Sequence, residues 1–418
     1  MLRAPISIRM KFLIELLNPL SSADDCAEIL KGMNSENWEG LTALCAQHDL
    51  LSALEFRFSQ LGLAHQIPEP HRQSFRSAYM LTAARNILLL NHACQILLRL
   101  RAENIPVIAL KGLFLLENIY KDVGARSMSD LDILVHREDL NRTIEILQGL
   151  GYQLSRYFDI RDSNLDIKHV PPMTLSDGTH VEIHWTLLEE DEPFTIAMDG
   201  VWQRSFPAQI NGIDVLAEGI EDLLLHLCIH LTYQHYLSLG LKGMFDIALV
   251  LQRYQDQLDW PCFVALCQQW RAEKTAALTL ELLRALQWAI IPEQVLAQLS
   301  PTPIDDRVLT EAYQILLQDE HAIHNLTPDM VQLASESNLF KRLSLIFQRV
   351  FLPRITIARI YQIPPSSPRI LWGYFLRLKD LIKAYGGTVQ KITKKDPSLL
   401  ADVSQKKSVY ELHEWLIS

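Results

Sequence analysis

The sequence predicts an α+β protein in which a small mixed sheet is flanked by mainly helical regions. Residues 1–100 and the chain beyond 216 repeat apolar side chains at intervals of three and four, the spacing of amphipathic helices. Between them, residues 101–215 alternate short β-branched runs with helical segments, which is typical of a mixed or antiparallel sheet. At 418 residues the chain is too long for one ordinary core, so several domains are expected.

The first hundred residues predict an N-terminal helical region. MLRAPISIRMKFLIELLNPL has a basic start and a short apolar stretch, but Glu15 and Asn18 interrupt it and it lacks a small-residue cleavage site. We therefore interpret it as an amphipathic helix and not as a leader. Residues 77–105, SAYMLTAARNILLLNHACQILLRLRAENI, contain no Gly or Pro and predict one long helix.

Residues 101–215 predict the α/β core. Two short runs, IPVIAL at 105–110 and DLDILV at 130–135, are expected strands, and a helical pattern follows each of them. Residues 152–158 predict another strand. Residues 168–188 predict a hairpin with an Asp-Gly turn, because this dipeptide readily adopts the backbone angles of a tight hairpin turn.

The rest of the chain predicts two further helical regions. Residues 216–300 keep the helical period, and a polar, proline-containing break near residue 300 separates them from residues 301–418. Within the latter, residues 341–385 carry nine Lys or Arg against one acid, Asp380, although the whole chain has a net charge of −10. This basic tract could bind an anionic partner or pack on the acidic remainder, and we favour packing. Nucleic acid is not favoured as a partner, because an acidic protein binds it poorly without specificity.

The overall composition is that of a globular protein. Hydrophobic residues make up 49% of the chain and charged residues 21%, and no apolar run is long enough to span a membrane. Six cysteines are scattered without a CxxC pair or a Cys/His zinc spacing. This pattern predicts reduced, buried thiols and a cytoplasmic protein.

Asp130 and Asp132 open the second predicted strand. The period of two puts both carboxylates on one face, where two like charges repel each other unless a cation lies between them. Glu182 alternates with Val181 and Ile183, so it too is expected on one face of a strand. Three converging carboxylates suit hard divalent cations, above all Mg²⁺, and a pair of ions would remove the repulsion.

Lys111 and Gly112 stand where the first predicted strand turns into a helix. Free N–H groups and a partial positive charge at a helix start attract phosphate, and glycine permits close approach. A Lys-Gly pair alone is usually a turn, and an Asp-x-Asp alone is usually a strand start that faces solvent. The order strand, glycine, helix, acidic strand, helix, acidic strand is more specific, and it indicates a metal–triphosphate site.

The stretch VIALKGLFLLENIYKDVGARSMSDLDILVHREDLNRTIEILQGLGY, with EIHW further on, carries a resemblance. It is similar to the core of bacterial nucleotidyltransferases of the polymerase-β superfold, and more closely to a large, poorly characterised family of that group. The flanking helical stretches resemble the same family over roughly residues 25–300. The resemblance implies a polymerase-β-like nucleotidyltransferase core.

This resemblance implies roles for individual residues. Gly112 would hold the triphosphate of an NTP, with ATP as the default donor. Asp130 and Asp132 would bind two Mg²⁺ ions, and Glu182 would complete the metal site and could activate the acceptor hydroxyl. The wider superfamily has Gly-Ser in its phosphate loop, whereas a leucine follows the glycine here. Lys111 could supply the missing phosphate contact as a charge.

Four further polar residues have both a functional and a structural interpretation. Arg126 could neutralise a phosphate or lie on the surface near a turn. His226 and His230 are four residues apart without the Glu of a zinc-binding HExxH motif, so they could line the cleft or be core histidines. Asp246 lies in an apolar helix and needs a partner, for which either histidine would serve.

The leading hypothesis is an enzyme that transfers NMP from an NTP to a hydroxyl of a small molecule, a peptide or protein, or RNA, and releases pyrophosphate. One alternative is a non-catalytic nucleotide-binding or scaffold protein with a degenerate transferase pocket, which the leucine after Gly112 suggests. A toxin–antitoxin component ranks below both, because the helical flanks make this chain larger than such modules tend to be.

Overall fold

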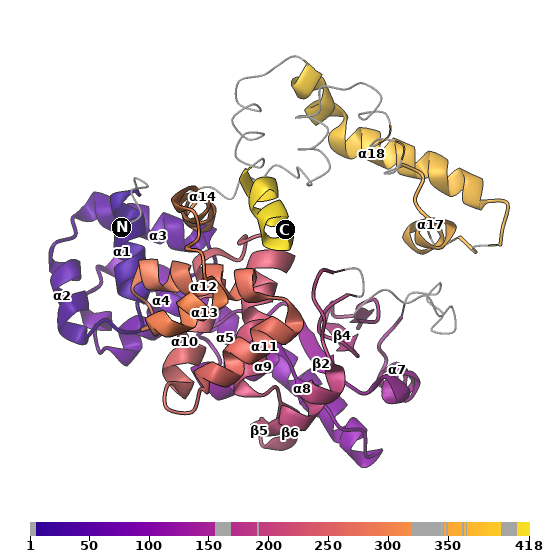
Figure 1. Cartoon of the computed structure of the whole chain (residues 1–418), viewed down its shortest axis with the longest axis horizontal. Helices are drawn as coiled ribbons and strands as arrows, with labels where there is room; N and C mark the ends of the chain where they lie inside the picture. The colour runs from indigo at the N-terminus through magenta and orange to yellow at the C-terminus, as the bar shows by residue number, and fades with distance from the viewer. Residues whose placement is uncertain are drawn as a thin grey trace. The chain divides into compact units, whose positions relative to one another are not determined.

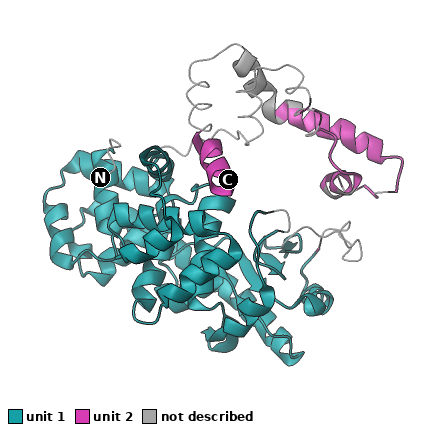
Figure 2. Cartoon of the chain, in the orientation of Figure 1, with its two compact units in different colours: residues 1–153, 166–321 teal, residues 154–165, 322–418 magenta. Residues whose placement is uncertain are grey.

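The chain divides into two compact units, one of residues 1–153 and 166–321 and the other of residues 154–165 and 322–418 (Figure 2). The computed structural model describes residues 6–154, 169–189, 192–318, 344, 347, 350–361, 363–364, 366–393 and 408–418. Among these residues, no helix combines the length and the apolar character needed to cross a membrane. The predicted regions 1–100 and 216–300 lie in the first unit, together with most of region 101–215. The predicted division of the chain into four regions, with 301–418 as the fourth, stays a prediction.

Helices form the N-terminal part of the first unit (Figure 1). They are α1 (Ile8–Leu17), α2 (Ala23–Lys31), α3 (Ser35–Gln47), α4 (Leu51–Gln60), the 3₁₀ turn η1 (Ala64–Gln66) and α5 (Glu69–Ala102). Ser22 and Asn34 begin α2 and α3, because each side chain accepts a hydrogen bond from the third helical residue, whose side chain accepts one in return. α5 contains no Gly or Pro beyond its first turn and runs for 34 residues.

A six-stranded mixed sheet follows, which confirms the predicted α+β class. Its strands are β1 (Ile108–Ala109), β2 (Leu131–Leu134), β3 (Met173–Thr174), β4 (His180–His184), β5 (Phe206–Ile210) and β6 (Ile213–Ala217). Their spatial order is β3-β4-β2-β1-β6-β5. β2 is parallel to β4 and β1 is parallel to β6, while the other neighbours are antiparallel. All four residues of β2 are buried, so this strand lies in the core.

Two hairpins build the outer strands. The predicted hairpin is β3–β4, and Gly178 in its turn has φ +88°, which an L residue rarely adopts. The β5–β6 hairpin was not predicted, although Asn211-Gly212 has the positive φ angles, 46° and 77°, of a tight hairpin turn. Most of the strand expected at 152–158 lies outside the described residues, and Gln153 forms an isolated bridge with Thr174.

Short helices connect the strands. They are α6 (Lys111–Phe114), which continues as the π-helical segment η2 (Leu115–Tyr120), the 3₁₀ turn η3 (Arg137–Asp139), α7 (Leu140–Gly149) and α8 (Met198–Arg204). α5 contacts β5, β6 and α7, while α6 contacts β2. The long helix of the N-terminal region is therefore part of the support of the sheet.

The first unit ends in a helical region, as expected. Its helices are α9 (Ile220–Ile229), the π-helical segment η4 (His230–Gln234), α10 (Gly240–Tyr254), α11 (Trp260–Trp270), α12 (Glu273–Leu286), α13 (Glu293–Leu299) and α14 (Asp306–Leu316). Trp288 Nε1 donates to the backbone oxygen of Ile14 at 3.0 Å, and Gln252 Nε2 donates to that of Pro19 at 3.1 Å. The helices before and after the sheet therefore pack together (Figure 1).

The second unit contains α17 (Arg354–Tyr361) and α18 (Ile370–Thr393), which belong to the predicted basic tract. Ile357, Ala358 and Ile370 form a small core between these two helices. Trp372 and Phe375 are exposed and stack with their ring centroids 4.8 Å apart. The rest of the tract lies partly outside the described residues. The packing favoured for this tract and the alternative of an anionic partner both stay predictions.

Candidate active site

A cavity of about 630 Å³ in the first unit collects most of the predicted site residues. It is lined by Lys111, Gly112, Arg126, Asp130, Asp132, Glu182, His230 and Asp246, all named from the sequence. The same cavity is lined by residues of the loop before α4 and of α5, so the N-terminal helical region contributes to its wall. His226 is not among the lining residues, and its place in a cleft stays a prediction.

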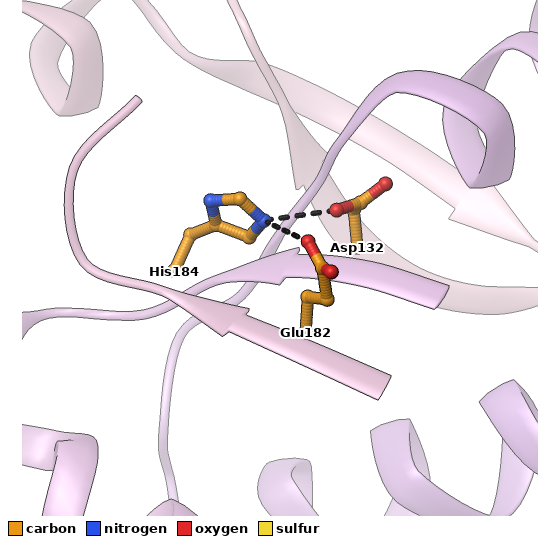
Figure 3. Close-up of side chains that lie close together, drawn as sticks. All are labelled: Asp132, Glu182 and His184. Atoms are coloured by element: carbon orange, nitrogen blue, oxygen red, sulfur yellow. Dashed lines mark hydrogen bonds and ion pairs between the residues drawn. The ribbon is translucent and has the colours of Figure 1, made fainter. Parts of the chain in front are cut away.

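Two carboxylates meet because β2 and β4 are neighbouring parallel strands. Asp132 pairs with Glu182 in the register of these strands, so their side chains lie on the same face of the sheet. His184 Nε2 lies 2.9 Å from Asp132 Oδ1 and 3.5 Å from Glu182 Oε2 (Figure 3). His184 was missed from the sequence, although the period of two puts it on the same face as Glu182.

The three acids have different electrostatic environments. Burial alone would raise the pKa of Asp132, but Lys111 and His184 hold it well below its ordinary value. Burial likewise opposes ionisation of Glu182, and the hydrogen bond from His184 lowers its pKa overall. Burial and the neighbouring Asp132 carboxylate raise the pKa of Asp130, whose Oδ1 accepts a hydrogen bond from Ser129 Oγ at 2.9 Å. The repulsion expected between the two aspartates is therefore present.

Lys111 compensates this negative charge in the structure. Its Nζ lies 3.3 Å from Asp132 Oδ1, and the residue is buried. Burial alone would lower the pKa of Lys111, but Asp132 and Glu182 raise it, so the side chain is a buried cation. Its φ is +39°, and this left-handed backbone costs a non-glycine residue about 1 kcal/mol. The predicted contact of Lys111 with phosphate stays a prediction.

Gly112 makes room for Arg126. A Cβ atom at this position would lie 2.9 Å from Arg126 Nη1 and 3.4 Å from Met128 Cγ. The space beside Gly112 is therefore filled by a guanidinium group, which gives a structural reason for the glycine besides the expected approach of a phosphate. Leu113, in the place of the superfamily serine, is buried in the core.

Arg126 is tied to Asp246 by a two-pronged ion pair. Its Nε and Nη2 donate to Asp246 Oδ1 and Oδ2 at 2.8 and 3.0 Å, and Tyr120 Oη donates to Oδ1 at 2.7 Å. His226 and His230 were expected as partners of Asp246, and this expectation is wrong. The surface position considered for Arg126 is also wrong, because only 15% of its side chain is exposed. The contact of Arg126 with phosphate stays a prediction.

Glu218, which directly follows β6, was missed together with its hairpin. It is buried, and its Oε1 lies 2.9 Å from His226 Nδ1. Its Oε2 is buried without a hydrogen-bond partner among the described residues. Burial raises the pKa of Glu218 to about 8, even though Lys111 and His184 favour the charged form. His226 is therefore a core histidine beside the site, whereas His230 lines the cavity, and burial lowers its pKa.

Glu218 is expected to make stability fall as the pH rises. The pKa of Glu218 is raised in the folded protein, so the folded state binds this proton more tightly than the unfolded state does. The protonated carboxyl therefore contributes stability that is fully present below the pKa of the unfolded state and is lost as the pH rises through about 8. Between pH 6 and pH 8, the wild type should lose about 2 kcal/mol more unfolding free energy than Glu218→Gln. Urea denaturation across this range measures the difference. Glu138→Gln, at an exposed position, is the control, and parallel curves for wild type and Glu218→Gln would contradict the prediction.

The donor set fits a divalent cation. One oxygen each of Asp132 and Glu182 and one nitrogen of His184 lie within 4.8 Å of one another. Two ligand atoms that each lie about 2.1 Å from one ion are at most about 4.2 Å apart. The separations of His184 Nε2 from the carboxylate oxygens of Asp132 and Glu182, 2.9 and 3.5 Å, are within this limit. This group contains two of the three predicted metal ligands and has His184 as its third member. Asp130 lines the same cavity, and its role as a ligand stays a prediction.

A small mixed sheet that presents carboxylates from neighbouring strands to a cavity lined with cations is the arrangement of a nucleotidyl-transferring enzyme. A family model described as an uncharacterised nucleotidyltransferase matches residues 34–287, more than half of the chain, and the chain belongs to this family. The family resemblance and the transferase class predicted from the sequence are confirmed. Comparisons with curated proteins and with solved structures found no significant match.

Proposed function

We propose that the protein is a Mg²⁺-dependent enzyme that transfers NMP from an NTP to a hydroxyl group of an acceptor and releases pyrophosphate. The observation that carries this proposal is the group formed by Asp132, Glu182 and His184 on two neighbouring strands of a nucleotidyltransferase core. Asp130 and Arg126 line the same cavity, so carboxylates for metal ions and a cation for phosphate lie in one site.

The protein's part in this reaction is chiefly positioning. The acceptor oxygen attacks the α-phosphorus, the bond to the bridging oxygen breaks, and pyrophosphate leaves. Two Mg²⁺ ions, held by Asp130, Asp132 and Glu182, would neutralise the triphosphate and stabilise the attacking and leaving oxygens. Glu182 is the better proton acceptor, because its side chain is 21% exposed, whereas Asp132 is 7% exposed and also contacts the Lys111 ammonium.

ATP is the default donor, and the acceptor is a small molecule, a peptide or protein, or an RNA end. We place the reaction in the cytoplasm, where NTPs are plentiful. Four of the six cysteines are buried, whereas Cys94 and Cys262 are half-buried, and buried thiols support a reducing compartment.

A non-catalytic nucleotide-binding protein is the second candidate. Leu113 favours it, because this buried side chain cannot replace the phosphate contact of a serine hydroxyl. The buried charges around Asp132 favour the enzyme, because burying carboxylates is costly and a binding scaffold has no evident need for them.

A thermal-shift titration with each of the four NTPs, with and without Mg²⁺, tests the proposed function. A ligand that binds only the folded state raises the melting temperature, by a few degrees when its concentration far exceeds the dissociation constant. We expect a Mg²⁺-dependent rise with at least one NTP that is absent in the Asp130→Asn/Asp132→Asn double variant. No rise with any NTP for folded wild-type protein would refute the proposal.

A further inference from the structure

Asp49, Ser127 and Lys242 meet at one side of the cavity and all three line it. Lys242 Nζ donates to Asp49 Oδ2 at 2.7 Å and to Ser127 Oγ, and Ser127 Oγ donates to Asp49 Oδ2. Ser127 precedes β2, Lys242 lies in the first turn of α10, and Asp49 lies between α3 and α4. A carboxylate from the N-terminal helical region thus occupies a small anion site formed by the core and α10.

The cations expected to hold phosphate have strong partners elsewhere. Lys111 compensates Asp132, and Arg126 is held by both oxygens of Asp246. Lys242 differs, because its partner Asp49 has a side chain that is 64% exposed. An ion pair with one exposed member is weak and its carboxylate is easily replaced by another anion. Among the lining cations that are paired with a carboxylate, Lys242 is therefore the one that a polyphosphate can take over at least cost.

The polarity of this subsite suits phosphate. Partial loss of hydration alone would raise the pKa of Asp49, but Lys242 and Ser127, with Arg126 nearby, lower it, so the site already stabilises an anion. Ser127 and Lys242 offer a hydroxyl and an ammonium, which are common hydrogen-bond donors to phosphate oxygens. Ser127 also supplies the hydroxyl that the phosphate loop lacks at Leu113.

We propose that Ser127 and Lys242 bind the terminal phosphates of the NTP, and that the Asp49 carboxylate occupies this subsite until the nucleotide displaces it. This inference rests on the proposed function. It names the part of the site that distinguishes a nucleoside triphosphate from a monophosphate. It also makes NTP binding and the Asp49 contact mutually exclusive, so the N-terminal helical region lowers the affinity for NTP.

Isothermal titration of the full-length chain with ATP, AMP and inorganic tripolyphosphate in the presence of Mg²⁺ tests the inference. Tripolyphosphate probes the subsite whatever the base preference. Lys242→Met should weaken binding of ATP and tripolyphosphate by about 10-fold or more, because a charge-assisted hydrogen bond is lost. Asp49→Asn should tighten both by about 3- to 5-fold, the strength of an exposed ion pair. AMP affinity should stay unchanged.

Two controls separate the subsite from general effects. Lys31→Met removes an exposed lysine from the end of α2 and should change no affinity. Ser127→Ala should weaken tripolyphosphate binding without removing a charge. Asparagine at position 49 tolerates the positive φ of 56° found there, so Asp49→Asn is expected to fold.

The outcomes distinguish this inference from the proposed function. The inference is wrong if Lys242→Met leaves tripolyphosphate and NTP affinity unchanged, if it weakens AMP equally, or if Asp49→Asn weakens NTP binding. In those cases, NTP binding that still depends on Mg²⁺ and Asp132 leaves the proposed function standing. Absence of any NTP or tripolyphosphate binding to the wild type would overturn both.

Discussion

Replacing Asp132 by asparagine is expected to slow nucleotidyl transfer by about 100- to 1,000-fold, the range for removing a single electrostatic contact to a transition state. Asparagine keeps the shape of the side chain and can still accept hydrogen bonds from Lys111 and His184. The substitution removes a negative charge that a divalent cation requires. Asp132 is also the most buried of the three acids, so water cannot easily replace this charge. The loss should therefore be electrostatic and not a change of fold.

Two measurements test this expectation. Pyrophosphate release from the NTP that stabilises the wild type reports the rate, and calorimetric titration with Mn²⁺ reports the cation site without any need for the acceptor. The affinity of Asp132→Asn for the cation should fall by at least about 10-fold. Asp214→Asn, at an exposed position on β6, is the matched control and should behave as the wild type.

A second variant guards against a folding effect. Asp132 compensates the buried ammonium of Lys111, so its loss can also lower stability. Glu182 is half-buried and Lys111 does not donate to it, so Glu182→Gln should fold and should lower both the rate and the cation affinity. Normal rates in folded Asp132→Asn and Glu182→Gln proteins would show that the carboxylates are not the metal site.

Local patterns predicted much of the core. The alternation around Asp132 and Glu182 fixed which face of each strand carries the acid, and an Asp-Gly dipeptide marked the β3–β4 turn. The parallel pairing of β2 with β4, which brings the two acids together, is set by the whole sheet, and the pattern of either strand alone does not predict it. The convergence of the acids was therefore inferred from the order of the elements and from the family resemblance, and not from either strand alone.

Some missed residues had a local signal. His184 is two residues after Glu182, so the same alternation that selected Glu182 puts His184 beside it. Glu218 follows the β5–β6 hairpin, and the Asn211-Gly212 dipeptide is a strong turn signal. Recognising this turn would have predicted a strand just before the helical region in sequence, with Glu218 directly after the end of that strand.

Other contacts had no local signal. Arg126 and Asp246 are 120 residues apart in sequence and meet only because α10 packs against η2 and the loop before β2. The sequence showed that a carboxylate in an apolar helix needs a partner, but nearby histidines were the wrong choice. An arginine in the loop before β2 was the stronger candidate, since its guanidinium can bind both oxygens at once.

Replacing Asp246 by asparagine is expected to lower the free energy of unfolding by about 3 to 5 kcal/mol, the cost of breaking a buried ion pair by removing one charge. Arg126 would keep a charge that burial disfavours, since Asp246 is what raises its pKa against the effect of burial. Tyr120 would also lose the carboxylate oxygen that accepts a hydrogen bond from its Oη at 2.7 Å. An amide can accept these bonds on one oxygen only.

Urea denaturation of the ligand-free chain measures this loss. Glu145→Gln is the control, because it breaks the exposed Arg142–Glu145 pair and should cost less than about 1 kcal/mol. Combining Asp246→Asn with Arg126→Met removes the uncompensated charge, so the double variant should lose less stability than the sum of the two single losses. Additive losses, or a loss below about 1 kcal/mol for Asp246→Asn, would show that the pair does not hold α10 against the core.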